Sequence, residues 1–142
     1  MAWAIIDTSV YVDHWERGLH ADALAELRRA YIIRASAVVL SELRRGARTR
    51  KAQKLVAALR QLTPSWTPMA EVWWRAGELV GRLGQRRTCD RTRYHAFQND
   101  ALIALTARRF GAAVATTNRE DFELLAREVG LRVLVLKQMQ TD

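Results

Sequence analysis

The chain has 142 residues, of which 49% are hydrophobic, so it is long enough for one ordinary domain with a sizeable core. Its 23 basic and 15 acidic residues give a net charge of +8, which favours a polyanionic partner such as nucleic acid. The single cysteine, Cys89, excludes an internal disulfide and a cysteine-type zinc site, and the three histidines lack metal-ligand spacing.

The sequence gives no sign of a membrane span or a secretory signal. No apolar run approaches the roughly 18 residues that a membrane span needs. Only a few apolar residues precede Asp7, and Asp13 and Glu16 soon follow, which does not fit a signal peptide. We therefore expect a cytoplasmic protein. Because no repeat or linker interrupts the chain, we also expect residues 1–142 to form one domain.

Four short apolar runs predict β-strands. They lack the apolar–polar alternation of a half-exposed strand, and parallel strands covered by helices on both faces have this pattern. The runs are residues 2–6, 31–35, 112–116 and 131–136.

Helical patterns occupy the segments between these strands. Ser36 is placed to cap a helix that ends at Gly46, and two later helices stop at Gly111 and Gly130, where a left-handed residue is expected. Strands alternating with helices predict an α/β sandwich around a parallel sheet. The expected helices cover 36–46, 50–62, 69–83, 100–110 and 119–129, and residues 85–98 are expected to be irregular.

Two acidic residues in the first third of the chain lie next to apolar elements. Asp7 follows the first strand, at the edge where open α/β sheets build their sites, or else it caps a helix that begins at Thr8. Glu42 lies three and four residues after two valines, so it shares the apolar face of its helix. A buried carboxylate is costly unless it is paired or binds a metal ion, and the alternative is a surface ion pair with Arg45.

Two further acids lie near the starts of late helices. Asp100 opens a strongly apolar helix, where it or the preceding asparagine could equally be an ordinary N-cap. Asp121 is expected at the third position of a helix capped by Asn118, where an acid complements the helix dipole. Glu120 is a close alternative to Asp121, and Glu123 a more distant one.

These acids lie in four segments whose order and spacing resemble the PIN-domain family, and more narrowly the VapC-type toxins of bacterial toxin–antitoxin pairs. The resemblance runs through most of the chain, although residues 50–97 match only in helical character. Each segment alone is weakly specific, and the four together in this order are specific for the family. The segments are Ile6-Asp7-Thr8-Ser9, Ser36 to Gly46, Asn99-Asp100-Ala101-Leu102-Ile103-Ala104 and Val114 to Phe122.

The resemblance implies a PIN-like α/β/α sandwich with a central, mostly parallel sheet, and a metal-dependent endoribonuclease that uses Mg²⁺, or Mn²⁺ in its place. It also implies a cognate antitoxin that covers the active site, and a homodimer. Some relatives carry an acid where this chain has Asn118, which makes Asp121 the more important fourth carboxylate. The implied catalytic and metal-binding residues are Asp7, Glu42, Asp100 and Asp121, and the implied supporting residues are Ser9, Thr117 and Asn118.

Four carboxylates suit the cleavage of an RNA phosphodiester. Mg²⁺ prefers carboxylate and water oxygens, and it can stabilise the extra negative charge of the reaction and activate a water molecule. Four acids suffice for two metal ions roughly 4 Å apart, or for one ion and a carboxylate that orients the water. Without a cation the like charges repel, so at least one pKa among them should rise.

A basic segment between residues 43 and 66 contains seven positive residues and no acid. Because clustered arginines attract polyanions, we expect four of them to bind RNA, with a solvated helix face as the alternative. Two adjacent tryptophans further along, Trp73 and Trp74, cannot both face inward on one helix, so one is expected at a subunit or antitoxin interface. The four arginines are Arg44, Arg45, Arg48 and Arg50.

Two other functions stay open at this point. A catalytically inactive PIN fold would serve as a nucleic-acid-binding or scaffold protein, and metal-dependent cleavage would distinguish the nuclease from it. A DNA nuclease of the flap-endonuclease type shares a related core, but the chain lacks the long insertions with which such enzymes hold DNA.

Overall fold

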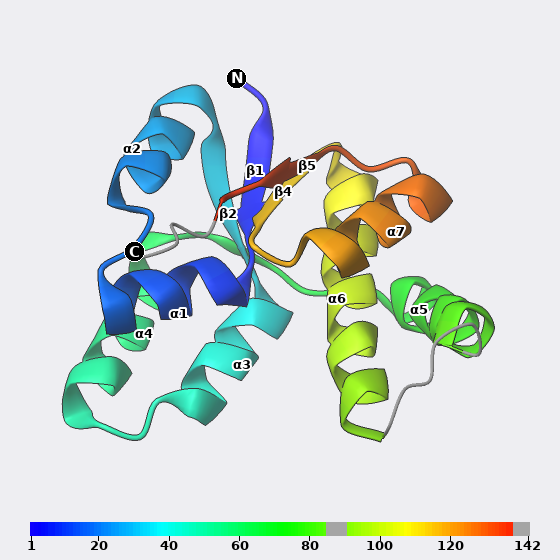
Figure 1. Cartoon of the computed structure of the whole chain (residues 1–142), viewed down its shortest axis with the longest axis horizontal. Coiled ribbons are helices and arrows are strands. Elements are labelled where there is room, and N and C mark those ends of the chain that lie inside the picture. The colour runs from blue at the N-terminus through cyan, green and yellow to red at the C-terminus, as the bar shows by residue number, and fades with distance from the viewer. Residues whose placement is uncertain (85–90, 138–142) are drawn as a thin grey trace.

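A computed structural model describes residues 1–84 and 91–137 of the chain. In these ranges five parallel strands form one sheet in the order β3-β2-β1-β4-β5 (Figure 1). The expected α/β architecture with a parallel central sheet is therefore confirmed. The strands are Trp3–Ile6 (β1), Ile32–Ser36 (β2), Ser65–Trp66 (β3), Ala113–Thr116 (β4) and Val133–Val135 (β5).

Helices cover the sheet on both sides. In Figure 1 α1, α2 and α4 lie to the left of the strands, α5, α6 and α7 lie to the right, and α3 lies below them. No helix in the described ranges combines the length and the apolarity needed to cross a bilayer. The helices are Thr8–Arg17 (α1), Ala21–Ala30 (α2), Ala37–Gly46 (α3), Arg50–Leu62 (α4), Ala70–Gly84 (α5), Arg91–Phe110 (α6) and Arg119–Val129 (α7).

The core lies between the central strands and α6. Ile5 in β1 and Val114 in β4 are fully buried and pair with each other in register. One helical turn of α6, from Ala101 to Ala104, is also fully buried, because this helix packs against both strands. The apolar runs therefore form buried strands and a buried helix, as the absence of alternation predicts.

Several predicted helix ends are confirmed by their capping geometry. Ser36 accepts a hydrogen bond from the backbone N–H of Val38 at 3.1 Å and so caps α3. Gly111 and Gly130 have φ values of +68° and +73°, the left-handed conformation that stops α6 and α7. Local sequence signals therefore place these boundaries correctly.

The beginning of α6 corrects the prediction. This helix was expected to start at Asp100 after an irregular stretch over 85–98, but it starts at Arg91, and residues 85–90 lie outside the described residues. The reason is packing: Phe97 is only 3% exposed, and Tyr94 packs partly buried against the core. Tyr94, Phe97 and Ala101 have helical spacing, so an aromatic signal for the extra turns was present. Asp100 therefore lies inside a helix and is not its N-cap.

Two other elements were not expected from the sequence. The helix α2 buries Leu24 and Leu27 three residues apart, a signal too short to stand out among charged neighbours. The strand β3 has only two residues, Ser65 and Trp66, which pair with the end of β2. A two-residue strand at the edge of a sheet has no apolar run by which it could be recognised.

Candidate active site

The four predicted acids come from four elements that meet at the carboxyl edge of the sheet. Asp7 follows β1 directly, Glu42 lies on α3 just after β2, and Asp121 lies at the start of α7 just after β4. Asp100 lies inside α6, the helix that packs against both β1 and β4. In a parallel sheet the carboxyl ends of neighbouring strands lie at one edge, and this is where open α/β folds build their sites.

Asp7 is buried and accepts hydrogen bonds through both carboxylate oxygens. Its Oδ1 accepts from the backbone N–H of Thr8 at 2.8 Å, so Asp7 caps α1. Its Oδ2 accepts from the hydroxyls of Thr116 at 2.8 Å and Ser9 at 3.1 Å. Burial raises the pKa of Asp7, the charge of Glu42 raises it further, and the three hydrogen bonds oppose the rise. Asp7 thus caps a helix and also lies in the candidate site.

Glu42 is half-buried and faces α1. Its Oε1 accepts a hydrogen bond from the hydroxyl of Thr8 at 2.9 Å. No ion pair joins Glu42 to Arg45, and both residues lie in the described part of the chain. The alternative of a surface ion pair is therefore wrong, and Glu42 lies on the inner side of α3.

Asp100 is a second buried carboxyl whose pKa is raised. Burial raises its pKa to about 9, and the charges of Asp7, Asp121 and Glu42 add to the rise in that order. The side chain is close enough to all three acids for their charges to act on it, although the four come from widely separated parts of the sequence. The expected rise of at least one pKa among them is therefore confirmed.

Asn118 joins the two late acids. It caps α7, and its side-chain oxygen accepts from the backbone N–H of Asp121 at 3.4 Å. Its side-chain Nδ2 donates to Asp121 Oδ2 at 3.0 Å and to Asp100 Oδ2 at 3.4 Å. The alternatives Glu120 and Glu123 are exposed, and Glu123 lies 3.9 Å from Arg119. Asp121 is therefore the acid of α7 that lies at the site.

Hydroxyl groups hold the loop ends together around Asp7. Ser9 Oγ accepts from the backbone N–H of Thr117 at 3.3 Å, and Thr116 Oγ1 accepts from the backbone N–H of Asn118 at 3.0 Å. Ser9, Thr117 and Asn118 thus lie where the resemblance implied. Thr116 and Thr8 were not predicted, although a buried threonine that ends an apolar strand is a visible signal for Thr116.

The acids do not form a ready-made metal-binding group. Over residues 1–84 and 91–137, no three Asp, Glu, His or Cys side chains lie close enough together to hold an ion. The prediction of a compact four-carboxylate cluster is therefore wrong for this arrangement. The physical reason is that like charges repel, while Thr8 and Thr116 hold two of the carboxylates and Asn118 holds the other two.

The donor chemistry nevertheless fits a hard cation. All four groups offer carboxylate oxygens, which Mg²⁺ and Mn²⁺ prefer. The pKa of Asp100 reaches about 9 in a buried position beside three other acids. A bound cation would stabilise the ionised form of this carboxyl better than water does. The chemistry of the residues present therefore fits such an ion, although their side chains would have to move to bind it together.

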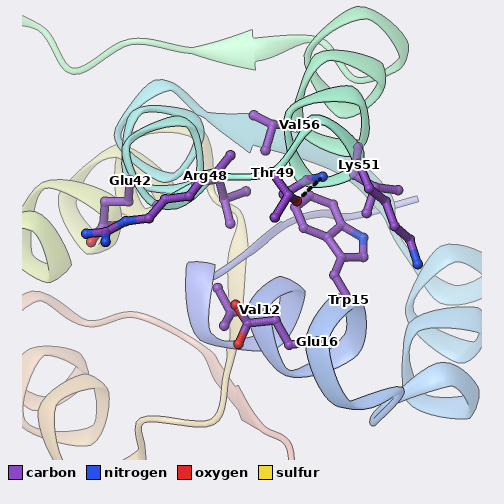
Figure 2. Close-up of a pocket in the computed structure, with 13 residues that line it drawn as sticks. Val12, Trp15, Glu16, Glu42, Arg48, Thr49, Lys51 and Val56 are labelled. Atoms are coloured by element: carbon purple, nitrogen blue, oxygen red, sulfur yellow. Dashed lines mark hydrogen bonds between the residues drawn. The ribbon is translucent and has the colours of Figure 1, made fainter.

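Glu42 lines two hollows in the surface. The larger has a volume of about 530 Å³ and lies between α1, α3 and α4. Figure 2 shows Val12, Trp15 and Glu16 extending into it from α1, opposite Val56 of α4. The smaller has a volume of about 240 Å³. Glu42 is therefore the acid of the site that borders open space, on two sides.

Two of the four predicted RNA-binding arginines line these hollows. All four are exposed, and they lie on α3, on the turn after it and at the start of α4. Arg48 lines the larger hollow and Arg45 the smaller one. Positive charge therefore borders the acidic site on the side of α3.

Comparison with known proteins gives a family and a set of similar folds. The PIN domain model matches residues 4–128, and no curated protein matches the chain. The structure of VapBC2 from Rickettsia felis, bound to a DNA fragment from its promoter, is 21% identical with a TM-score of 0.69, and the match covers 95% of this chain and 99% of that one. The structure of VapBC-1 from nontypeable Haemophilus influenzae is 19% identical with a TM-score of 0.70, and the match covers 94% of this chain and 97% of that one.

A third similar structure is VapC20 of Mycobacterium tuberculosis, described as a toxin that cleaves the sarcin–ricin loop. It is 17% identical with a TM-score of 0.62, and the match covers 85% of this chain and 94% of that one. At such identities the likeness of the structures shows a shared fold. The match to the family model spans most of the chain, and so the chain belongs to the PIN domain family.

Proposed function

We propose that the chain is a Mg²⁺-dependent endoribonuclease and the toxin of a toxin–antitoxin pair. One observation supports this most: four acids from distant parts of the chain meet at Asp100, whose pKa burial raises to about 9, with the charges of Asp7, Asp121 and Glu42 adding to the rise. A carboxyl that is buried beside other acids is destabilising for a merely structural arrangement and is typical of functional sites. The nuclease activity of the PIN family agrees with it, and the Mycobacterium tuberculosis toxin supports RNA as the substrate.

In this proposal Asp7, Glu42, Asp100 and Asp121 hold the metal ion. When bound, the ion supplies charge stabilisation for the cleaved phosphate and for the attacking water. The chain itself orients the ligands, because hydroxyls fix Asp7 and Glu42, and Asn118 fixes the other two.

The remaining parts of the proposal concern partners and place. The similar structures from Rickettsia felis and Haemophilus influenzae are VapBC complexes, which supports a cognate antitoxin as a partner of this chain. The larger hollow suits such a partner, because apolar Val12, Leu43 and Leu55 line it beside the basic Arg48 and Lys51. We further propose that the protein is a homodimer and that it acts in the cytoplasm.

The metal dependence of RNA cleavage tests this function. Purified chain is incubated with a labelled single-stranded RNA, with Mg²⁺, with Mn²⁺ and with EDTA, and with a DNA of the same sequence as a control. We expect cleavage of the RNA with either metal ion and none in EDTA. Binding without cleavage under every metal condition would instead identify an inactive, nucleic-acid-binding PIN fold.

The arginines of α3 and the following turn should contribute to RNA binding by pairing with phosphates. Replacing all four, Arg44, Arg45, Arg48 and Arg50, by Gln should weaken binding to a similar degree for different RNA sequences. Salt weakens RNA binding, and its effect is measured as the slope of the logarithm of the binding constant against the logarithm of the salt concentration. The magnitude of this slope should decrease by about 0.7 for each replaced arginine that pairs with a phosphate in the wild type. Fluorescence anisotropy over a range of salt concentrations measures both quantities.

A matched control for this variant replaces exposed arginines elsewhere. Arg28 and Arg29 lie exposed on α2, and their change to Gln should leave the slope unchanged. If the four-fold variant keeps both the affinity and the slope, the arginines form a solvated face or contact a protein.

A further inference from the structure

The smaller hollow beside Glu42 has a mixed lining. It has a volume of about 240 Å³ and is lined by α3, the connection between β3 and α5, α5 and α6. Its lining includes an aromatic residue, Trp73, a basic one, Arg45, and an amide residue, Asn99, beside the apolar Ala37, Val38 and Pro68. A purely apolar ligand would use only the aromatic ring and the apolar residues, and would not use the cation or the hydrogen-bonding amide.

Trp73 offers an accessible aromatic surface at the hollow. Its exposed fraction is 49%, although it is a large apolar residue on a helix that buries Val72 and Ala76 beside it. Its neighbour Trp74 is 75% exposed but does not line the hollow. An exposed indole stacks on nucleobases of any sequence, because every base has an aromatic face. The two tryptophans have the same chemistry, but Trp73 lines the hollow and Trp74 does not.

The size of the hollow fits one planar ring system. A cavity of about 150 Å³ accommodates benzene, so a hollow of about 240 Å³ has room for one nucleobase. An α-helix with its side chains is about 10–12 Å across and exceeds such a space. Asn99 supplies both a donor and an acceptor for the edge of a base, and Arg45 supplies a cation for a phosphate.

The hollow reaches the acidic site at one of its four acids. Glu42 lines it, and Asn99 directly precedes Asp100 in α6. We propose that this hollow binds one nucleobase of single-stranded RNA, stacked on Trp73, from a nucleotide next to the phosphate that is cut. This proposal rests on the proposed nuclease function for the position of that phosphate, and it identifies unpaired RNA as the substrate class.

The test measures RNA binding in the Asp7→Asn background, which removes cleavage. The probes are a short fluorescein-labelled single-stranded RNA of mixed sequence and an abasic version of the same RNA. With intact RNA, we expect Trp73→Ala to weaken binding about 5- to 150-fold, the range for removal of one base–aromatic stack. Trp73→Phe should restore most of the affinity, and Trp74→Ala should leave it unchanged.

The abasic RNA separates stacking from other roles of Trp73. Without bases there is no stack to remove, so Trp73→Ala should not weaken the binding of this probe further. Equal losses of affinity on intact and abasic RNA, or equal effects of Trp73→Ala and Trp74→Ala, would overturn the proposal. The proposal is also overturned if Trp73→Ala dissociates an oligomer in light scattering and leaves RNA affinity unchanged, because Trp73 then belongs to a subunit interface.

This experiment can fail separately from the nuclease proposal. If the wild type cleaves RNA with Mg²⁺, and Trp73→Ala changes neither binding in the Asp7→Asn background nor cleavage when it is the only substitution, the base site is wrong and the nuclease stands. If the wild type never cleaves RNA, but Trp73→Ala still weakens the binding of intact RNA and not of abasic RNA, the nuclease proposal is wrong and the base site stands. Circular dichroism of each variant verifies folding, which should survive because Trp73 is half exposed.

Discussion

The Asp100→Asn and Asp7→Asn variants should lose metal-dependent RNA cleavage by about 100-fold or more. Charge stabilisation by a metal ion contributes several kcal/mol to such a reaction, and each 1.36 kcal/mol corresponds to a factor of ten in rate. Asparagine keeps the shape of the carboxylate and removes the charge that holds the ion. Initial rates of cleavage of one labelled RNA at saturating Mg²⁺ measure the loss.

Both variants should stay folded, for reasons visible in the structure. Asn at position 7 still accepts the hydrogen bond from Thr8 that caps α1, and Asn is as good an N-cap as Asp. Asn at position 100 is a neutral group of the same shape as the carboxyl, which is itself protonated near neutral pH in the metal-free protein because its pKa is about 9. Asp22→Asn, on the exposed face of α2, makes the same chemical change away from the site and should keep full activity. Wild-type rates in either site variant would refute the role of these acids.

The second large expected effect is on how the free energy of unfolding of the metal-free protein depends on pH. The pKa of Asp100 rises from 3.8 to about 9 on folding, so between these values the folded state binds a proton that the unfolded state has lost. The free energy of unfolding should therefore fall as pH rises through this window, by about 1.4 kcal/mol per pH unit at most for this one group. Below pH 3.8 the pH dependence from this group disappears, because Asp100 is protonated in both states.

The difference between the wild type and Asp100→Asn isolates this contribution. The pKa of Asp7 is also raised, whereas the pKa of Asp13 is lowered by its contacts with Arg17 and His20. The pH dependence of the free energy of unfolding of the wild type therefore combines contributions from several groups. Urea unfolding in EDTA between about pH 5 and 8 should show the variant gaining stability over the wild type as pH rises. Parallel curves for the two proteins would show that Asp100 titrates normally.

Short-range sequence signals predicted the elements that position the site. The caps at Ser36 and Asn118, and the left-handed stops at Gly111 and Gly130, depend on residues within a few positions of one another. The placement of Asp7 after a buried strand likewise follows from the local pattern. The match of these segments to a known family then indicated which acids would meet.

The contacts that complete the site could not be predicted in the same way. Thr116 bonds Asp7 from 109 positions away, and Thr8 bonds Glu42 from 34 positions away. Such pairs depend on sheet order and helix packing, which no local pattern encodes. The true start of α6 was missed for a different reason, because Phe97 packs into the core from within a basic segment.

The spacing of the acids was the least predictable feature. The sequence pattern predicts one compact cluster of four acids, whereas neighbouring hydroxyls and Asn118 hold them as separate groups whose charges still act on one another. A cation would have to draw them together against these hydrogen bonds. Metal affinity should therefore depend on the partners of the acids as well as on the acids themselves.

The most direct test is a calorimetric titration of Mn²⁺ into the metal-free protein, at constant ionic strength and without RNA. We expect saturable binding to the wild type and to Asp22→Asn, with affinity at least about tenfold weaker in Asp100→Asn, because this variant has one ligand fewer for the ion. Proton release should accompany binding to the wild type near neutral pH, since Asp100 must ionise to bind the ion. No binding to the wild type, or equal binding to Asp100→Asn, would contradict a metal site built from these four acids.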